Sequence, residues 1–93
     1  MEVKDNVFQR QYEYEHEKGL FRIEYTEQER KVFLTKIVVP DSVDEAEINS
    51  FIQAVLDLLH EKNARVVPTA SKIVNFFKKN HQYKSMLPPG VVV

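Results

Sequence analysis

The hydrophobic pattern changes its period at Pro40, and this change constrains the fold more than any other feature of the sequence. Before it, residues 32–39 are apolar on both alternating faces, with Phe33, Thr35, Ile37 and Val39 on one and Val32, Leu34, Lys36 and Val38 on the other. Such a strand is expected inside a sheet. Pro40 has no N–H to donate, so it ends the strand. After it, apolar residues recur along one face of a helix, at Ile48, Phe51, Ile52, Val55, Leu56 and Leu59.

The ends of this helix are also marked in the sequence. Ser42-Val43-Asp44-Glu45 matches a capping box, in which the serine hydroxyl bonds an orphan backbone N–H and the glutamate reaches back. Asn63 is the expected terminator, because asparagine tolerates the left-handed conformation that ends helices. Residues 65–67 then form a short strand closed by Pro68. A strand, a helix and a strand in this order make a βαβ unit, so the two strands should be parallel.

The flanking segments complete an α+β (α/β) fold, with a mostly antiparallel sheet, one parallel βαβ unit and two helices. Phe21, Ile23 and Tyr25 alternate with Arg22 and Glu24, which places the charged pair on the opposite face of a strand. The expected elements are strands at 8–15 and 20–26 joined by a turn at Glu17-Lys18-Gly19, a polar connection at 27–31, a helix at 71–80 that buries Ile73, Val74, Phe76 and Phe77, and a turn at 81–87.

The length of 93 residues fits one domain, 1–93, in which we expect 1–7 and 88–93 to be flexible or loosely packed. There is no cysteine, which excludes a disulfide framework or a thiolate metal site and fits the cytoplasm. The charged N-terminal residues do not read as a secretory signal. No apolar run approaches the roughly 20 residues of a membrane span.

Charge is divided unevenly along the chain. Residues 37–61 hold six acids and no Lys or Arg, whereas 62–93 hold six Lys or Arg and no acid. Solvated helix faces explain this pattern, and so does an anion-attracting C-terminal third. The split also permits head-to-tail association of copies, without fixing an oligomeric state. The basic residues are not interleaved with aromatic residues in a recognisable motif, so neither a nucleic acid nor a membrane is the expected partner.

Three segments carry a resemblance to a known family. They are Val39-Pro40 with the helix after it, Val66-Val67-Pro68-Thr69-Ala70-Ser71, and Phe76-Phe77-Lys78-Lys79-Asn80-His81-Gln82-Tyr83. In this order they resemble the small single-domain branch of the GCN5-related N-acetyltransferases. The resemblance covers residues 8–87 and needs no gap between Val39 and Tyr83. It implies a minimal acetyltransferase fold, with acetyl-CoA as the possible cofactor and a protein or small-molecule amine as acceptor.

The resemblance also assigns site positions. The backbone of Ile37, Val38 and Val39 would pair with the pantetheine amides, and Lys78 would meet the 3′-phosphate of CoA. Tyr83 is the candidate acid for the departing thiolate, although such a tyrosine more often only packs its ring. The start of the long helix, Asp44, Glu45, Ala46, Glu47 and Ile48, would take the pyrophosphate, and Ala70 would lie near the acetyl group.

Two of these positions depart from the family pattern. Asp44 to Glu47 replace its Arg-Gly-x-Gly loop, so there is no glycine, and Asp41 adds a fourth carboxylate. Ala70 stands in place of a cysteine and has no proton to give or take. The carboxylates have no calcium-loop spacing, and neither His16 nor His60 has a partner at ligand spacing, so no metal site is predicted.

Two hypotheses follow for the function. In the first, the chain is an active N-acetyltransferase that moves acetyl from acetyl-CoA to an amine. In the second, the fold has kept its shape, has lost or weakened acetyl-CoA binding, requires no cofactor, and acts as a non-catalytic binding or interaction domain. The acidic loop and Ala70 favour the second hypothesis.

Overall fold

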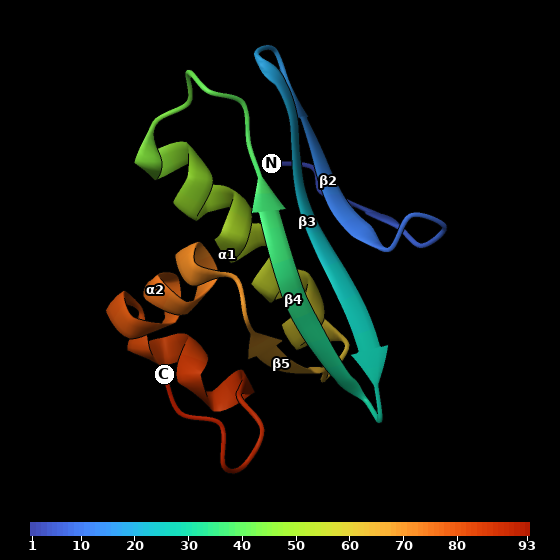
Figure 1. Cartoon of the computed structure of the whole chain (residues 1–93), viewed down its shortest axis with the longest axis vertical. Helices are drawn as coiled ribbons and strands as arrows, with labels where there is room; N and C mark the ends of the chain where they lie inside the picture. Colours follow the sequence, from blue (N-terminus) through green and yellow to red (C-terminus); the bar gives the residue numbers. More distant parts are fainter.

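Five strands form one mixed sheet whose order in space is their order in the sequence (Figure 1). The computed structural model describes residues 1–93. The strands β1 to β4 pair antiparallel, and β4 and β5 pair parallel. This arrangement confirms the predicted α+β class and the parallel βαβ unit. The elements are β1 (Lys4–Asn6), β2 (Gln11–His16), β3 (Gly19–Gln28), β4 (Lys31–Val38), α1 (Glu45–Glu61), β5 (Arg65–Pro68), α2 (Ser71–Lys79) and the 3₁₀ helix η1 (His81–Met86).

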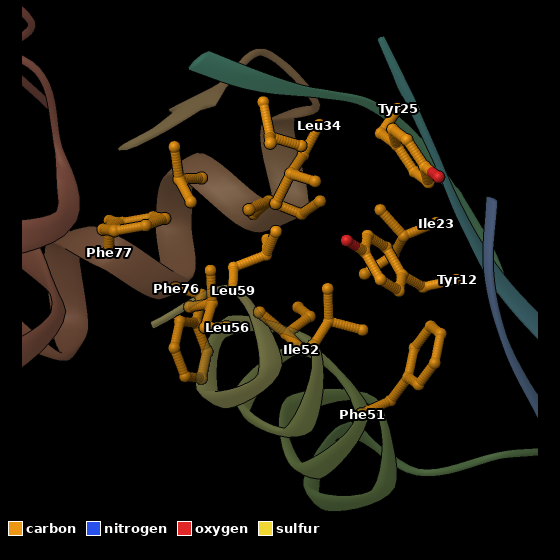
Figure 2. Close-up of a cluster of buried hydrophobic side chains, with 14 of the residues drawn as sticks. Tyr12, Ile23, Tyr25, Leu34, Phe51, Ile52, Leu56, Leu59, Phe76 and Phe77 are labelled. Atoms are coloured by element: carbon orange, nitrogen blue, oxygen red, sulfur yellow. The ribbon is translucent and has the colours of Figure 1, made fainter. Parts of the chain in front are cut away.

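The two α-helices share a single core with one face of the sheet. Figure 2 shows Tyr12, Ile23, Tyr25 and Leu34 of the sheet directed toward Phe51, Ile52, Leu56 and Leu59 of α1, with Phe76 and Phe77 of α2 beside them. The cluster holds 17 buried residues, and no polar or charged residue is buried. The predicted helical stripe from Ile48 to Leu59 is therefore the core face of α1. No helix is long and apolar enough to cross a membrane.

The other face of the sheet carries charges in opposite-sign pairs. Glu13 lies across from Arg22, and Glu24 lies across from Lys36. Arg22 and Glu24 also form an ion pair along β3. Each favourable cross-strand pair contributes roughly 0.2–1 kcal/mol. The prediction that Arg22 and Glu24 face away from the core is confirmed, and the pairing explains how this face is kept in water.

A β-bulge in β4 overturns the predicted assignment of its faces. Glu24 pairs with Lys36 and Tyr25 pairs with Leu34, so Thr35 is one residue more than β3 can match. The extra residue reverses the alternation that follows it. Val32 and Leu34 face the core before the bulge, but Ile37 and Val39 pack on the core after it. The prediction that Ile37 and Val39 lie opposite Val32 and Leu34 was wrong for this reason.

The N-cap of α1 differs from the prediction, and its C-cap agrees. Asp44, not Ser42, caps the helix, because the Asp44 carboxylate accepts the Glu47 N–H at 2.8 Å. At the other end Asn63 has φ 56°. Its N–H bonds the His60 carbonyl, and the N–H of the next residue bonds that of Leu59, both at 3.0 Å. This pair of bonds is a Schellman motif, in which asparagine takes the left-handed position.

The N-terminal strands also differ in extent from the prediction. The strand predicted from residue 8 begins only at Gln11, and Phe8 is 93% exposed in the preceding turn. β1 was not predicted, because three residues are too short for an alternating pattern. β3 continues to Gln28, so the polar connection is only the two-residue turn Glu29–Arg30.

Candidate functional site

The candidate site lies where β4 and β5 part. β4 pairs with β3 as far as Val38, but it pairs with β5 only as far as Leu34. There the Leu34 carbonyl accepts the N–H groups of Thr69 at 3.0 Å and Ala70 at 3.2 Å, and the chain turns into α2. The edge of β4 beyond Leu34 is left without a partner strand (Figure 1). Such an edge can pair with an extended group that carries amides.

The predicted pantetheine positions form this open edge. Ile37 and Val39 are half-buried and pack on the core, and Val38 lies on the charged face opposite Arg22. Ala70 marks the start of the opening through its bond to Leu34. It is also the N-cap of α2, where its methyl group caps nothing. The structure therefore brings Ile37–Val39 and Ala70 to the two sides of one opening.

The start of α1 follows β4 after a six-residue connection, 39–44. The first amides of a helix point outward and suit an anion. Here the amide of Glu47 is already bonded to the Asp44 carboxylate, and the amide of Ile48 is bonded to the Asp44 carbonyl at 3.2 Å. Only the amides of Glu45 and Ala46 are left at the helix start. The carboxylates of the same short segment surround them.

The tip of the β2–β3 hairpin holds this connection in place. The Lys18 ammonium donates to the Ser42 carbonyl at 2.9 Å. Gly19, at φ 137°, lies so close to Pro40 that an added Cβ would come within 3.1 Å of its ring. These contacts join residues far apart in the sequence, so no local pattern indicated them. The only signal was the basic residue in the predicted turn and the acids in the connection.

His16 completes the clamp. Its Nδ1 accepts the Lys18 N–H at 3.0 Å, so a neutral His16 carries its proton on Nε2. That Nε2 lies 3.0 Å from Glu47 Oε2. The contact is electrostatic and lacks the alignment of a hydrogen bond, because Glu47 Oε2 is buried without a hydrogen-bond partner. A hollow of about 260 Å³ lies beside it, between Tyr14 and Ser50. No three side chains in the chain are grouped so that they could hold a metal ion.

The two remaining predicted residues lie away from the start of α1. The Tyr83 ring packs against Phe76 at 5.5 Å, and its hydroxyl donates to Asp57 at a long 3.4 Å. Burial raises the pKa of Tyr83, and the Asp57 carboxylate raises it further. Asp57 is 12 residues after Glu45, or about 18 Å along the helix axis. Lys78 is exposed in the last turn of α2, about 12 Å along the axis from Ala70.

Comparison with known proteins agrees with the arrangement of this site. A search of curated proteins finds no match. A family model described as GCN5-related N-acetyl-transferase matches residues 11–86, from the first residue of β2 to the last residue of η1. The matched segment includes the open edge of β4, the start of α1 and the β5–α2 junction. The chain therefore belongs to the GCN5-related N-acetyltransferase family.

Proposed function

We propose that this chain is an acetyltransferase-fold protein that has lost or weakened acetyl-CoA binding and acts as a non-catalytic binding domain, with a protein or a small-molecule amine as its partner. The observation that carries the proposal is the start of α1. Its third amide is occupied by the Asp44 carboxylate, and Glu45 and Glu47 stand in the same turn. The absence of cysteine is in keeping with a role in the reducing cytoplasm.

Electrostatics argues against a pyrophosphate at this helix start. A carboxylate about 6–7 Å from a phosphate charge costs about 0.6–2.6 kcal/mol, depending on the local dielectric. Two such carboxylates weaken binding from about ten-fold to several thousand-fold. The helix dipole contributes only about 0.3–1 kcal/mol in the opposite direction. The net effect at Asp44–Glu47 is therefore repulsion of the anion.

Steric and geometric features support the same conclusion. No glycine is present between Asp44 and Glu47, so each residue there carries a Cβ that obstructs a close approach of phosphate to the backbone. The contacts of Lys18 with Ser42 and of Gly19 with Pro40 restrain the connection against moving away. Ala70 offers no group for proton transfer beside the opening.

A second candidate function, an active N-acetyltransferase, is supported by the open edge of β4. The edge at Ile37–Val39 depends on the backbone and not on side chains, so it is retained despite the acidic loop. Direct acetyl transfer mainly requires a positioned thioester and a neutral amine. A Tyr83 with a raised pKa is protonated at neutral pH and so could serve as the acid. Lys78 would then meet the 3′-phosphate.

A thermal-shift titration separates the two candidates. We expect no change in melting temperature with millimolar acetyl-CoA or CoA. A ligand at a hundred times its Kd stabilises by about 2.7 kcal/mol, which is roughly 10 °C or more for a domain of this size. Such a shift, lost in Lys78→Ala, would overturn the proposal in favour of the enzyme.

A matched variant tests the cause. In the quadruple variant D44R/E45G/A46K/E47G, the acids and side chains that oppose the pyrophosphate are removed, and we expect a CoA-dependent shift to appear. If this variant folds but still shows no shift, the electrostatic explanation is wrong.

A further inference from the structure

A second hollow lies at the other end of the sheet, between the end of α1 and the β3–β4 turn. Its volume is about 420 Å³, within the range of small-molecule sites. Three apolar or aromatic residues line it, Tyr12, Val32 and Leu59, together with three charged ones, Glu27, Arg30 and Lys62. Such a mixture of an apolar lining with a few charged groups is typical of sites for small organic ligands.

This hollow is separate from the candidate acetyl-CoA site. Val32 lines the hollow and Ile37 belongs to the open edge, and the two are five residues apart in β4. At about 3.3 Å per residue, that separation is roughly 17 Å. Whatever binds here does not depend on the loss or retention of acetyl-CoA binding.

The apolar part of the hollow is rigidly built. Tyr12 is 2% exposed, Leu59 1% and Val32 6%. The Tyr12 ring lies 4.9 Å from that of Tyr25, whose hydroxyl donates to Asp5 at 2.6 Å. A ligand group placed here therefore meets side chains that are already held by β1, β2, β3 and α1 (Figure 2).

The charged part offers one free group of each sign. The Lys62 ammonium lies 3.6 Å from Asp5, so its charge is already partnered. Glu27 and Arg30 are exposed, and neither takes part in an ion pair with the other or with any other residue. A carboxylate and a guanidinium thus stand on one hollow with their charges available to a ligand.

The β3–β4 turn fixes the position of Arg30 by an unusual backbone. Gln28 pairs with Lys31, and the two residues between them have positive φ, 50° at Glu29 and 69° at Arg30. Two-residue hairpin turns of this kind favour Asn-Gly, because glycine and asparagine adopt such angles with little strain. Backbone strain of this type gathers at ligand clamps. Arg30 is held beside the hollow by a turn for which its residue type is unfavourable.

We propose that this hollow binds an α-amino acid with an apolar or aromatic side chain. The ligand carboxylate pairs with the Arg30 guanidinium, which suits a two-bond contact with a carboxylate. The ligand ammonium pairs with Glu27. The side chain of the ligand lies against Tyr12, Val32 and Leu59.

Methyl NMR spectra of the full chain test the proposal with three related probes. They are L-phenylalanine, 3-phenylpropionate, which lacks the ammonium, and phenethylamine, which lacks the carboxylate. We expect millimolar L-phenylalanine to shift the methyl signals of Val32, Leu59 and Ala64, and to bind at least ten-fold tighter than either analogue. No shift of these signals, or equal affinity for all three probes, would overturn the proposal.

Charge-matched variants identify the two contacts. Arg30→Gln should weaken L-phenylalanine at least ten-fold and leave phenethylamine unchanged, and Glu27→Gln should do the reverse with 3-phenylpropionate unchanged. Lys72→Gln and Glu17→Gln remove exposed charges outside the hollow and should change nothing. An Arg30→Gln variant that binds L-phenylalanine as tightly as the unmodified chain would contradict the assignment.

A further variant guards against loss of folding. Glu29→Asn with Arg30→Gly supplies the residues that the turn favours, so it should melt at a higher temperature and still lose at least ten-fold in affinity for L-phenylalanine. Undiminished affinity in this folded variant would refute the role of Arg30. The acetyl-CoA titration reports on the opposite end of β4, so the two proposals can fail separately.

Discussion

Replacing Asp44 by alanine removes the side-chain bond that caps α1. The Asp44 carboxylate accepts the Glu47 N–H at 2.8 Å, and alanine leaves that amide to water. Loss of such a cap costs about 1 kcal/mol, within a range of about 0.5–2 kcal/mol. In a domain of this size the melting temperature then falls by about 4–8 °C. Circular dichroism melting and urea denaturation measure both quantities on the same sample.

Two companion variants make this prediction specific. Ser42→Ala removes the residue that the capping-box pattern favours, and it should change stability by less than about 0.5 kcal/mol because Ser42 caps nothing in the structure. Asp44→Asn keeps a capping oxygen and removes the charge, so most of the stability should return. A loss of 1 kcal/mol in Ser42→Ala, with Asp44→Ala unchanged, would refute the assigned cap and restore the sequence-based one.

The other predictions concern the turns and the tyrosines. Glu29→Asn with Arg30→Gly should raise stability by about 1–2 kcal/mol, since left-handed angles cost other residues about that much each; a lower urea midpoint would contradict it. Gly19→Ala should cost about 1 kcal/mol or more, because its φ is 137° and its Cβ would crowd Pro40; a melt matching the unmodified chain would contradict it. Burial and the nearby Asp5 raise the pKa values of Tyr12 and Tyr25. The folded state therefore holds these phenol protons more tightly than the unfolded state does. This stability is complete below pH about 10 and is lost above it. Absorbance titration should show these two tyrosines ionising only as the chain unfolds, and ionisation before unfolding would contradict the burial of their hydroxyls.

The sequence predicts those elements whose hydrophobic pattern is long enough to define a period. The strand 32–39 and the helix that begins after Pro40 belong to this class, and so does the terminator Asn63. The bulge at Thr35 does not, because β4 is apolar at both parities and one extra residue leaves no visible break. The cap was misplaced by two residues because Ser42-x-x-Glu45 and Asp44-x-x-Glu47 are the same pattern.

The candidate site was predictable only in part, for a related reason. The acidic replacement of the loop is a local feature, so the sequence contains it. The contacts of His16 with Glu47 and of Lys18 with Ser42 join a hairpin tip to a distant connection, and only the folded chain brings them together. The unpaired Glu27 and Arg30 are similar, because their meeting with Tyr12 and Leu59 depends on how α1 crosses the sheet.

The order of the strands has a consequence for how the chain folds. The pairs from β1 to β4 join neighbours in sequence, so each can form as a local hairpin. The β4–β5 pair joins Lys31 to Arg65 and must wait until α1 has crossed between them. The opening at Leu34 and Ala70 is therefore assembled late, and its amides should exchange with solvent earlier than those of β2 and β3. The part of the fold that the family uses for its cofactor is, in this chain, the part with the least cooperative support.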